Sequence, residues 1–496
     1  MSIDLHSLFQ GLPIIQMTGD SKTTITSLSI DSRRVASGSL FFALGGLRTD
    51  GNKYIDEAVH HGAVAIVSES PLWVPPRVAL IQVESIRDVL AEVSRRFYGN
   101  PQRSLDLYGV TGTNGKTTVS TLLKHFLEEP GAPVGLLGTV AYVIGGRTLP
   151  SYRTTPEAPD IYGLLAQMRN AGCHAGVMEV SSHGIDQHRV QQLPFKTVAF
   201  TNLTQDHLDY HKTMESYFEV KSRIFTGATG LLPESVVINV DDEYGRRLLG
   251  MIPAGVRVIT YGIEKDADFR ATQVVMRQEG TRFNLQLKNG TSLQVESPML
   301  GHYNVSNVLC AMALAAASGQ TPSSMLEKLR RFPGVPGRTE RVSVGQPFTV
   351  LVDYAHTDDA LRNVLSMLRN ITPGRILTVY GCGGNRDRSK RPKMTRAAMA
   401  GSDLIWATAD NPRGESLDVI FQDMHAGVSD PARIAFIQDR RQAISTAINA
   451  ARPGDTLLIA GKGHETYQEF ADSVVPFDDR AIARELLLQK LNQRMS

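Results

Sequence analysis

Residues 105–127 constrain this chain most, because they predict a strand, a glycine loop and a helix in immediate succession. Residues 105–110 form a mostly apolar run that is suited to a buried strand. Gly112 and Gly115 follow, and apolar residues then recur at the spacing of one helical face. Backbone N–H groups at the start of such a helix bind phosphate, so the segment predicts a phosphate-binding loop.

The side chains of this loop suit a nucleoside triphosphate. Lys116 would place a cation near the β- and γ-phosphates, and the Thr117 hydroxyl would bind Mg²⁺. The strict P-loop pattern has glycine five residues before Gly115, where this chain has Val110. The alternative interpretation is a glycine turn without a ligand, which the Gly-Lys-Thr-Thr sequence in this context disfavours.

Length and composition indicate a multidomain globular protein. A chain of 496 residues is too long for one core, so two to four domains are expected. The 52 Lys and Arg residues nearly balance the 50 Asp and Glu residues, which gives no overall basic field for nucleic acid. Three scattered cysteines fit neither a disulfide framework nor a zinc motif. With no signal peptide and no apolar run of about 18 residues, a cytoplasmic protein without membrane insertion is expected.

The pattern along the chain predicts an α/β fold in three domains. Residues 1–100 predict a small domain with strands at 38–44 and 63–67 and helices at 54–61 and 89–98. Residues 101–334 contain further apolar runs at 176–180, 197–200 and 236–240, which are typical of buried parallel strands. Residues 269–295 then alternate, with turns at 279–280 and 289–290, as in an antiparallel meander.

Residues 335–496 predict a Rossmann-like α/β domain, which follows a linker-like segment at 332–338. Its four apolar runs, at 350–352, 376–379, 404–407 and 456–459, each end in a polar or glycine-rich loop. Ligands of open α/β sheets bind beyond the carboxyl ends of the strands, so this domain is expected to present one functional edge.

Several of these loops carry residues suited to chemistry. Glu179, His207 and Lys221 follow successive elements of the nucleotide domain, where a carboxylate and an imidazole suit Mg²⁺ or a second metal. A salt bridge or a histidine in a turn explains each one taken alone. Asp206 to His211 is denser in polar groups than a structural loop needs.

Two loops of the third domain suit a charged substrate. Residues 386–391 are basic, and arginine binds carboxylates bidentately. The alternative interpretation of this stretch is a solvated basic loop without a ligand. Residues 410–413 place an acid and a base around a proline turn, which would hold the ammonium and carboxylate of an amino acid; an ordinary turn is the alternative. The residues together favour an ATP-using enzyme for anionic and zwitterionic substrates.

Blocks of sequence from the central domain into the third resemble the Mur ligases of bacterial cell-wall synthesis. The blocks are residues 112–118, 178–183, 202–211, 301–307, 336–338 and 353–356, in the family's order. Asp410-Asn411-Pro412-Arg413 is similar to the block of members that add meso-diaminopimelate, whereas lysine-adding members carry a different residue at the position of Arg413. The family block after His356-Thr357 usually continues with proline, and here it continues with Asp358.

The resemblance implies an ATP-dependent amide ligase that works with Mg²⁺ through an acyl phosphate, as a monomer acting on small molecules. It implies catalytic roles for Lys116, Glu179, His207 and Lys221, with Thr117 and Glu179 on one Mg²⁺ and His207 and a carbamylated Lys221 on a second. It also implies three binding sets. For ATP these are Gly112, Thr113, Asn114, Gly115, Lys116, Thr117, Thr118, Asn304 and Arg338. For the UDP-N-acetylmuramoyl dipeptide they are Ile30, Ser32, Leu47, Arg48, Thr49, Thr154, Thr155, Ser181, Gln187 and Arg189. For meso-diaminopimelate they are Arg386, Asp410, Asn411, Pro412, Arg413, Gly461 and Glu465.

Two other hypotheses compete with this interpretation. A folylpolyglutamate synthase-like ligase shares the ATP chemistry but would lack the first domain and would not need the block at 410–413. A nucleotide-binding regulatory or scaffold protein with an inactive ligase core would be expected to lose Lys116, Glu179, His207 or Lys221, and all four are present.

Overall fold

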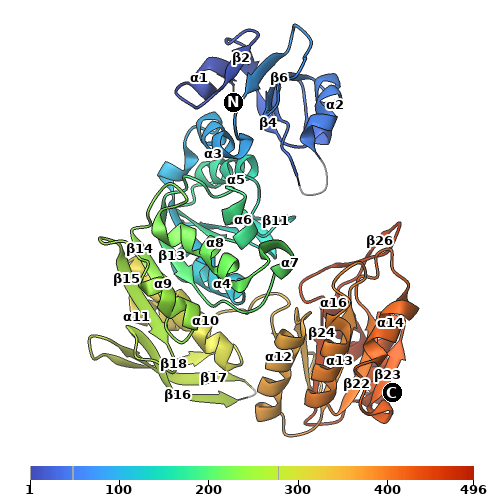
Figure 1. Cartoon of the computed structure of the whole chain (residues 1–496). Coiled ribbons are helices and arrows are strands. Elements are labelled where there is room, and N and C mark those ends of the chain that lie inside the picture. Colours follow the sequence, from blue (N-terminus) through green and yellow to red (C-terminus); the bar gives the residue numbers. More distant parts are fainter. Residues whose placement is uncertain (1, 47–49, 278, 496) are drawn as a thin grey trace. The chain divides into compact units, whose positions relative to one another are not determined.

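The computed structural model describes residues 2–46, 50–277 and 279–495 (Figure 1). Contacts divide the chain into two compact units, Met1–Arg270 with Asn307–Met325, and Ala271–Ser306 with Leu326–Ser496. The α/β fold class is confirmed, because both units are built on largely parallel sheets with helices. The domain boundaries at 100 and 334 stay a prediction.

The first unit begins with a small five-stranded sheet in the order β2-β7-β6-β5-β4. Strands β4 to β7 run parallel, and β2 is antiparallel to β7. The predicted helix at 89–98 begins three residues earlier, because Ser85 caps it by accepting a hydrogen bond from the Asp88 N–H at 3.4 Å. The elements are β1 (Ile3–Asp4), α1 (Leu5–Phe9), β2 (Gln16–Thr18), β3 (Thr24–Ile25), β4 (Ser27–Ser29), η1 (Ser32–Arg34), β5 (Ser39–Phe42), η2 (Gly51–Tyr54), α2 (Ile55–His60), β6 (Ala63–Ser68), β7 (Ala79–Gln82) and α3 (Ile86–Phe97).

The central sheet of the first unit has the order β11-β10-β9-β12-β8-β13-β14-β15. Strands β9, β12, β8, β13, β14 and β15 are parallel, so their carboxyl ends share one edge. The predicted strands at 105–110, 176–180, 197–200 and 236–240 are confirmed within one or two residues. The strands are β8 (Asp106–Thr111), β9 (Val134–Leu137), β10 (Ala141–Ile144), β11 (Arg147–Pro150), β12 (Ala175–Glu179), β13 (Phe195–Phe200), β14 (Ser235–Asn239) and β15 (Arg257–Gly262).

Helices pack against this sheet through the apolar faces that the sequence predicts. Helix α4 (Lys116–Leu127) buries Val119, Leu122, Leu123, Phe126 and Leu127, as its periodicity indicates. The other elements are η3 (Pro101–Ser104), α5 (Ala158–Asn170), α6 (Ser182–Asp186), α7 (Leu208–His211), α8 (Met214–Thr226) and α9 (Glu243–Leu249), followed by α10 (His302–Ala317) and α11 (Pro322–Arg330), which contribute to both units.

The second unit contains the predicted meander and a second sheet. Strands β16 (Phe269–Arg277), β17 (Gly280–Leu287) and β18 (Ser292–Ser297) form the meander and continue the order of the central sheet after β15. The first two residues of β16 belong to the first unit, where they pair parallel with β15, and β17 and β18 pair antiparallel. The second sheet has the order β19-β20-β24-β21-β22-β23, parallel except for β19. Its strands are β19 (Glu340–Arg341), β20 (Thr349–Asp353), β21 (Ile376–Cys382), β22 (Leu404–Ala409), β23 (Ile434–Ile437) and β24 (Thr456–Ala460).

Separate cores cover the two faces of this second sheet, as in a Rossmann-like fold. One core packs Leu361 and Met394 against Tyr380, and the other contains Ile444 and Leu487. The helices are α12 (Asp358–Ile371), α13 (Lys390–Gly401), α14 (Leu417–His425), η4 (Pro431–Arg433), α15 (Arg440–Ala450) and α16 (Asp479–Met495); the hairpin β25 (Tyr467–Glu469) and β26 (Val474–Pro476) precedes α16. None of the helices in the described residues is long and apolar enough to cross a membrane.

Candidate active site

The phosphate loop joins β8 to α4 and depends on two glycines. Gly112 has φ +144° and Gly115 has φ +88°, and glycine adopts such angles without strain. A Cβ at Gly112 would overlap Thr201 Oγ1, and one at Gly115 would overlap Asn307 Oδ1. The loop therefore needs glycine for both its backbone angles and its close packing.

The loop is braced by the segment after β13. The Asn114 N–H donates to Asn202 Oδ1 at 2.9 Å, and Thr201 Oγ1 donates to the Asn114 carbonyl at 2.6 Å. Lys116 Nζ donates to the carbonyls of Gly112 and Thr113, each at 2.9 Å. The ammonium thus lies over the loop, close to the N-terminus of α4, where a phosphate would bind.

Glu179, at the end of β12, is a buried carboxylate that contacts the loop. Its Oε2 accepts hydrogen bonds from Thr117 Oγ1 at 3.0 Å and Thr139 Oγ1 at 2.9 Å, and its Oε1 accepts the Thr139 N–H at 2.8 Å. Adjacent parallel strands place Thr117 and Glu179 together, as the sequence predicts. Thr139 was not predicted, because nothing local marks a threonine whose partner lies 40 residues away.

The donor set around Glu179 suits Mg²⁺. The Thr117 hydroxyl and the Glu179 carboxylate are hard oxygen ligands, and Mg²⁺ is usually held by one or two carboxylates together with substrate phosphates and water. The described residues contain no group of three or more His, Cys, Asp or Glu that could hold a metal ion. The fit is therefore to a metal that phosphate oxygens help to bind.

Lys221, on α8, is buried beneath the phosphate loop. Its Nζ donates to the Gly112 carbonyl at 3.0 Å and Thr111 Oγ1 at 3.4 Å, and lies 4.8 Å from the centre of the Tyr217 ring. Burial, with the nearby Lys116 charge, lowers the pKa of Lys221 well below its usual range. A neutral amine is the form that reacts with CO₂ to give a carbamate, so this environment suits the predicted modification.

His207 lies in a cluster of aromatic rings beside the loop. Its φ is +53°, and its ring centre lies 5.0 Å from that of His183 and 6.2 Å from that of Tyr217. Burial lowers the pKa of His207, and it lowers the pKa of His183 to about 4 with help from His207 and His211. Both imidazoles are therefore neutral at pH 7, the form in which histidine binds a metal.

Four predicted dipeptide-binding residues form one hydrogen-bonded group. Thr155 Oγ1 accepts the Ser181 N–H and donates to the Glu179 carbonyl, each at 2.9 Å. Arg189 donates to the Thr155 carbonyl at 2.8 Å and to Gln187 Oε1 at 2.5 Å.

Thr154 lies beside Thr139, because the two hydroxyl oxygens are 2.9 Å apart, and Thr139 Oγ1 in turn donates to Glu179 Oε2. Arg153, which the sequence analysis did not assign to the site, forms an ion pair with Glu157 at 2.6 Å. Glu157 also pairs with Arg189 at 3.0 Å.

Two of the five predicted uridine-nucleotide residues, Ile30 and Ser32, follow strand β4 of the small sheet in the first unit. Ser32, in η1, donates to Glu57 Oε2 at 2.7 Å and is buried, and Ile30 is half-buried. Leu47, Arg48 and Thr49 lie outside the described residues. The structure therefore places two of these five residues.

Asn304 and Arg338 belong to the second unit. Asn304 Nδ2 donates to the Leu300 carbonyl at 2.8 Å. The Arg338 guanidinium lies 4.7 Å from the centre of the Tyr354 ring, and among the described residues its buried Nε has no hydrogen-bond partner. Asp358 is the first residue of α12, directly after the N-cap Thr357. A carboxylate is favoured near the positive end of the helix dipole, so aspartate suits this position, where the family usually has proline.

The predicted amino-acid residues converge where β21, β22 and β24 end. Glu465 Oε2 accepts hydrogen bonds from Asn411 Nδ2 at 2.9 Å and from the buried Lys462 Nζ at 3.1 Å. Gly461 has φ +114°, and a Cβ there would lie 2.7 Å from Asp410 Oδ2. Glycine thus lets these two loops approach each other.

Asn411 and Lys462 support this edge from within. Asn411 Oδ1 accepts hydrogen bonds from Lys462 Nζ at 2.9 Å and from the Glu469 N–H at 3.1 Å. The Asn411 side chain is therefore engaged mainly with its own protein, which makes it a support for Glu465. Lys462 was not predicted, because the sequence shows only a lysine between two glycines.

Arg413 and Arg386 are the cations of this edge. Arg413 Nη1 donates to the Gly384 carbonyl at 3.1 Å, and the Gly384 N–H donates to the carbonyl of Asn411, next to Pro412, at 2.9 Å. A Cβ placed on Gly383 would contact both Arg413 Nη1 and Arg386 Cγ. Both guanidinium-bearing side chains therefore flank the loop after β21.

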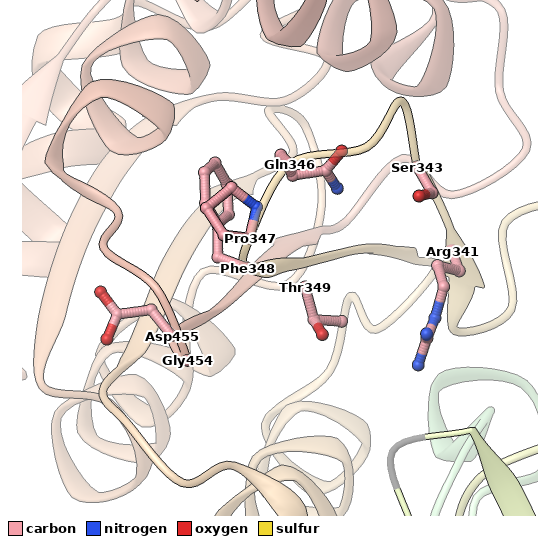
Figure 2. A pocket seen from close by; sticks show the side chains of 8 residues that line it. All are labelled: Arg341, Ser343, Gln346, Pro347, Phe348, Thr349, Gly454 and Asp455. Atoms are coloured by element: carbon pink, nitrogen blue, oxygen red, sulfur yellow. The ribbon is translucent and has the colours of Figure 1, made fainter. Parts of the chain in front are cut away.

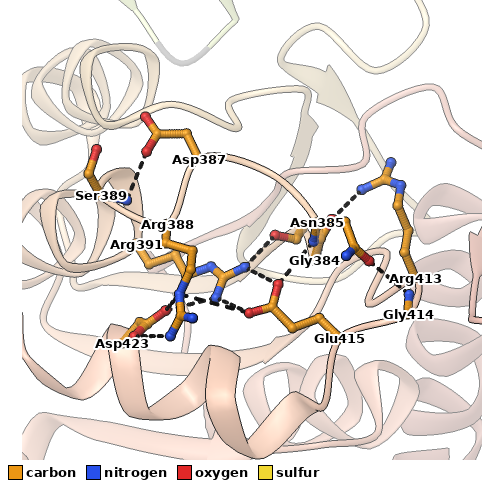
Figure 3. Close-up of polar contacts among 11 residues, drawn as sticks. Gly384, Asn385, Asp387, Arg388, Ser389, Arg391, Arg413, Gly414, Glu415 and Asp423 are labelled. Carbon is orange, nitrogen blue, oxygen red and sulfur yellow. Dashed lines mark hydrogen bonds and ion pairs between the residues drawn. The ribbon is translucent and has the colours of Figure 1, made fainter. Parts of the chain in front are cut away.

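An ion-pair network contacts the loop that follows β21 (Figure 3). The buried Arg391 pairs with Glu415 at 2.6 Å and with Asp423 at 2.8 Å, and Arg388 pairs with Asp423 at 2.9 Å. Glu415 also accepts the Asn385 N–H at 2.9 Å. The hydrogen bonds from Arg391 hold the pKa of Glu415 at about 2. The predicted basic stretch is thus partly structural, since Arg388 and Arg391 are paired with acids.

A small cavity of about 220 Å³ lies elsewhere on the second sheet (Figure 2). Its lining includes Arg341, Thr349 and Asp455, and the latter two lie at the N-terminal ends of β20 and β24. The candidate amino-acid-binding residues instead follow the carboxyl ends of β21, β22 and β24, at the opposite edge of the sheet. This cavity is therefore separate from the amino-acid edge.

Comparisons with known proteins agree with this class of site. Three family models match: "Mur ligase family, catalytic domain" at residues 24–98, "Mur ligase middle domain" at 110–315 and "Mur ligase, glutamate ligase domain" at 337–463. The chain belongs to the Mur ligase family. Curated relatives named UDP-N-acetylmuramoyl-L-alanyl-D-glutamate–2,6-diaminopimelate ligase include one from Solibacter usitatus, 45% identical over 94% of both chains, and one from Geobacillus thermodenitrificans, 42% identical over 98% of this chain and 99% of the relative.

Solved structures agree with the fold. A structure of UDP-N-acetylmuramoyl-L-alanyl-D-glutamate–2,6-diaminopimelate ligase has a TM-score of 0.69 and 32% identity, and covers 99% of this chain and 100% of its own. A folylpolyglutamate synthase from Mycobacterium tuberculosis has a TM-score of 0.61 at 18% identity, and covers 75% of this chain and 91% of its own. The second likeness concerns the fold alone.

Proposed function

We propose that this ligase uses ATP to join meso-diaminopimelate to UDP-N-acetylmuramoyl-L-alanyl-D-glutamate, in the cytoplasmic synthesis of peptidoglycan precursors. The observation that carries the proposal is the edge of the second sheet, where Asp410, Glu465, Arg386 and Arg413 place acids and cations together. Such an edge matches the ammonium and carboxylate groups of a diamino diacid. Two curated relatives that match over 94% and 98% of this chain are named as ligases of this reaction.

The reaction proceeds through an activated carboxyl group. The γ-carboxylate of D-glutamate takes the γ-phosphoryl group of ATP, giving an acyl phosphate and ADP. The amine of diaminopimelate then attacks the acyl carbon, loses a proton and expels inorganic phosphate, which leaves an amide. A carboxylate is a poor electrophile until its oxygen becomes such a leaving group, and this explains the need for ATP.

The residues of the first unit have defined roles in this proposal. The N–H groups of residues 112–118 and the Lys116 ammonium bind the phosphates and stabilise the charge of the transferring phosphoryl group. Thr155, Ser181 and Arg189 orient the dipeptide beside Glu179. Thr117 and Glu179 would hold one Mg²⁺, and His207 with a carbamylated Lys221 would hold a second; Mg²⁺ neutralises phosphate charge when bound.

The second unit selects the amine. Arg413 meets the distal carboxylate of diaminopimelate, which lysine lacks. A desolvated arginine left without its partner costs about 2–5 kcal/mol, which is sufficient to disfavour lysine strongly. We also assign the division at 1–100, 101–334 and 335–496 to uridine-nucleotide, ATP and amino-acid domains of a monomer.

The test is whether ATP turnover requires both other substrates. ADP formation should need the nucleotide-dipeptide and diaminopimelate together, and mass spectrometry should show the nucleotide-tripeptide. Turnover with a folate substrate would favour the folylpolyglutamate synthase-like alternative. ATP binding without turnover under any condition would favour the regulatory alternative.

A further inference from the structure

Two residues of β25, Gln468 and Glu469, contact the loop that carries Arg413. Gln468 Nε2 donates to the Asp410 carbonyl at 2.9 Å, and Glu469 makes three contacts. The Glu469 N–H donates to Asn411 Oδ1 at 3.1 Å, and its carbonyl accepts the Arg413 N–H at 2.9 Å. Its carboxylate Oε2 lies 2.8 Å from Arg413 Nε. The backbone N–H, the carbonyl and one carboxylate oxygen of Glu469 thus contact the loop of residues 410–413.

Arg413 needs such support. Its φ is +52°, a left-handed angle that is uncommon for residues other than glycine. Its backbone forms a bridge with Phe470, next to Glu469. The long arginine side chain also has many rotamers, and fixing it costs conformational entropy. The hairpin therefore supplies order that the loop does not supply by itself.

Among the described residues, the Arg413 guanidinium has two polar partners, Glu469 and Gly384, which leaves its Nη1–Nη2 edge available. Nε faces Glu469. Nη1 donates one hydrogen to the Gly384 carbonyl (Figure 3). Because the guanidinium is a rigid planar fork with five N–H donors, these two anchors fix its plane. The remaining N–H groups lie on the two Nη atoms, which form the edge that binds a carboxylate bidentately.

We propose that Glu469 is a positioning residue for amino-acid selection, which holds the Arg413 guanidinium ready for the distal carboxylate of the incoming amino acid. The inference rests on the proposed function and deepens it, because it assigns part of the specificity to the hairpin β25–β26. Glu469 acts through Arg413 and is not assigned a contact with the substrate.

Removal of the Glu469 carboxylate should leave the fold intact. The side chain is 39% exposed, and its two backbone hydrogen bonds do not depend on it. In Glu469→Ala, Arg413 must be ordered when the substrate binds, which should raise KM for meso-diaminopimelate roughly three- to tenfold. Glu469→Gln retains an oxygen acceptor for Nε and should show a smaller rise.

The experiment measures kcat and KM for meso-diaminopimelate and L-lysine with wild type, Glu469→Ala, Glu469→Gln, Arg413→Ala and the Glu469→Ala/Arg413→Ala double variant. Glu485→Ala is the matched control, because Glu485 pairs with Arg441 at 2.5 Å on the exposed surface of the same unit. Only KM for diaminopimelate should rise in Glu469→Ala, while KM for ATP and for the nucleotide-dipeptide stays unchanged.

The double variant separates positioning from a general structural role. In the Arg413→Ala background, Glu469→Ala should cause no further rise in KM for diaminopimelate. The inference would be overturned if Glu469→Ala raised KM for diaminopimelate equally in the wild-type and Arg413→Ala backgrounds, or did not raise it in the wild-type background. If wild type formed no product with diaminopimelate, the proposed function itself would fail, which is a different outcome.

Discussion

At the scale of single residues, burial determines the chemistry available to Lys221. Its amine lies beneath the phosphate loop and is hydrogen-bonded to the Gly112 carbonyl and the Thr111 hydroxyl. Its lowered pKa increases the fraction of neutral amine at pH 7. A carbamate there would convert a cation into an anionic oxygen ligand close to the phosphates. The residue's environment thus agrees with a role that its charge alone would oppose.

Lys221→Ala should reduce ligation at least about 100-fold, because the anionic ligand is lost. Added acetate or formate should restore part of the activity by occupying the vacated space. Lys196→Ala, which removes a partly exposed ion pair with Asp106, is the control and should have little effect. Full activity of Lys221→Ala without added carboxylate would contradict the carbamate assignment.

Arg413→Ala should narrow the preference for diaminopimelate over lysine by roughly 30-fold or more, because the partner of the distal carboxylate is removed. The measurement is the ratio of kcat/KM for the two amino acids. Arg441→Ala, which breaks an exposed ion pair, should leave that ratio unchanged. The same ratio in Arg413→Ala as in wild type would remove Arg413 from the specificity site.

At the scale of elements, the turn from β8 into α4 was the most predictable feature. An apolar strand, two glycines and a helix with a single apolar face are local patterns. The strand lies within one residue of its predicted bounds, and the helix buries the predicted apolar positions. Thr139 and Glu469 were unpredictable for the opposite reason. Their partners lie far away in sequence, so only the folded chain brings them to Glu179 and Arg413.

Gly112→Ala should distort the phosphate loop. The new Cβ would overlap Thr201 Oγ1, and φ +144° is strained for alanine, at a cost of about 1–3 kcal/mol. Urea unfolding should show the lower stability, and nucleotide titration should show weaker ATP binding. Gly146→Ala has open space around its Cβ and is the control. Unchanged ATP binding in Gly112→Ala would contradict the assigned loop geometry.

The ion-pair network of Arg388, Arg391, Glu415 and Asp423 should make the free energy of unfolding depend on pH in the acid range. Because Arg391 holds the pKa of folded Glu415 near 2, below the usual 4.5, the pair stabilises the fold above about pH 4.5 and loses this effect as pH falls towards 2. The urea midpoint of Glu415→Gln should therefore lie below that of wild type at pH 7 and approach it near pH 3.

Glu327→Gln removes an exposed ion pair with Arg331 and is the control for this measurement. Its midpoint should follow that of wild type across the same pH range. A constant difference between Glu415→Gln and wild type from pH 7 to pH 3 would contradict the assigned role of the ion pair.

At the scale of the whole molecule, the sequence predicted the kinds of domain and the edges that carry polar loops. Parallel strands place their carboxyl ends together, so the residues after β20, β21, β22 and β24 could be grouped before the structure was known. The sequence could not show which of these residues hold other residues of the site in place. Asn411 was predicted to bind the amino acid, yet its side chain contacts Lys462, Glu465 and the Glu469 backbone.

The most direct test of the account is phosphate release by the purified chain with ATP, Mg²⁺ and UDP-N-acetylmuramoyl-L-alanyl-D-glutamate, with either meso-diaminopimelate or L-lysine as the amine. We expect rapid release with diaminopimelate and little release with lysine. Equal release with both would contradict the role of the Arg413 edge, and no release with either would contradict the ligase assignment itself.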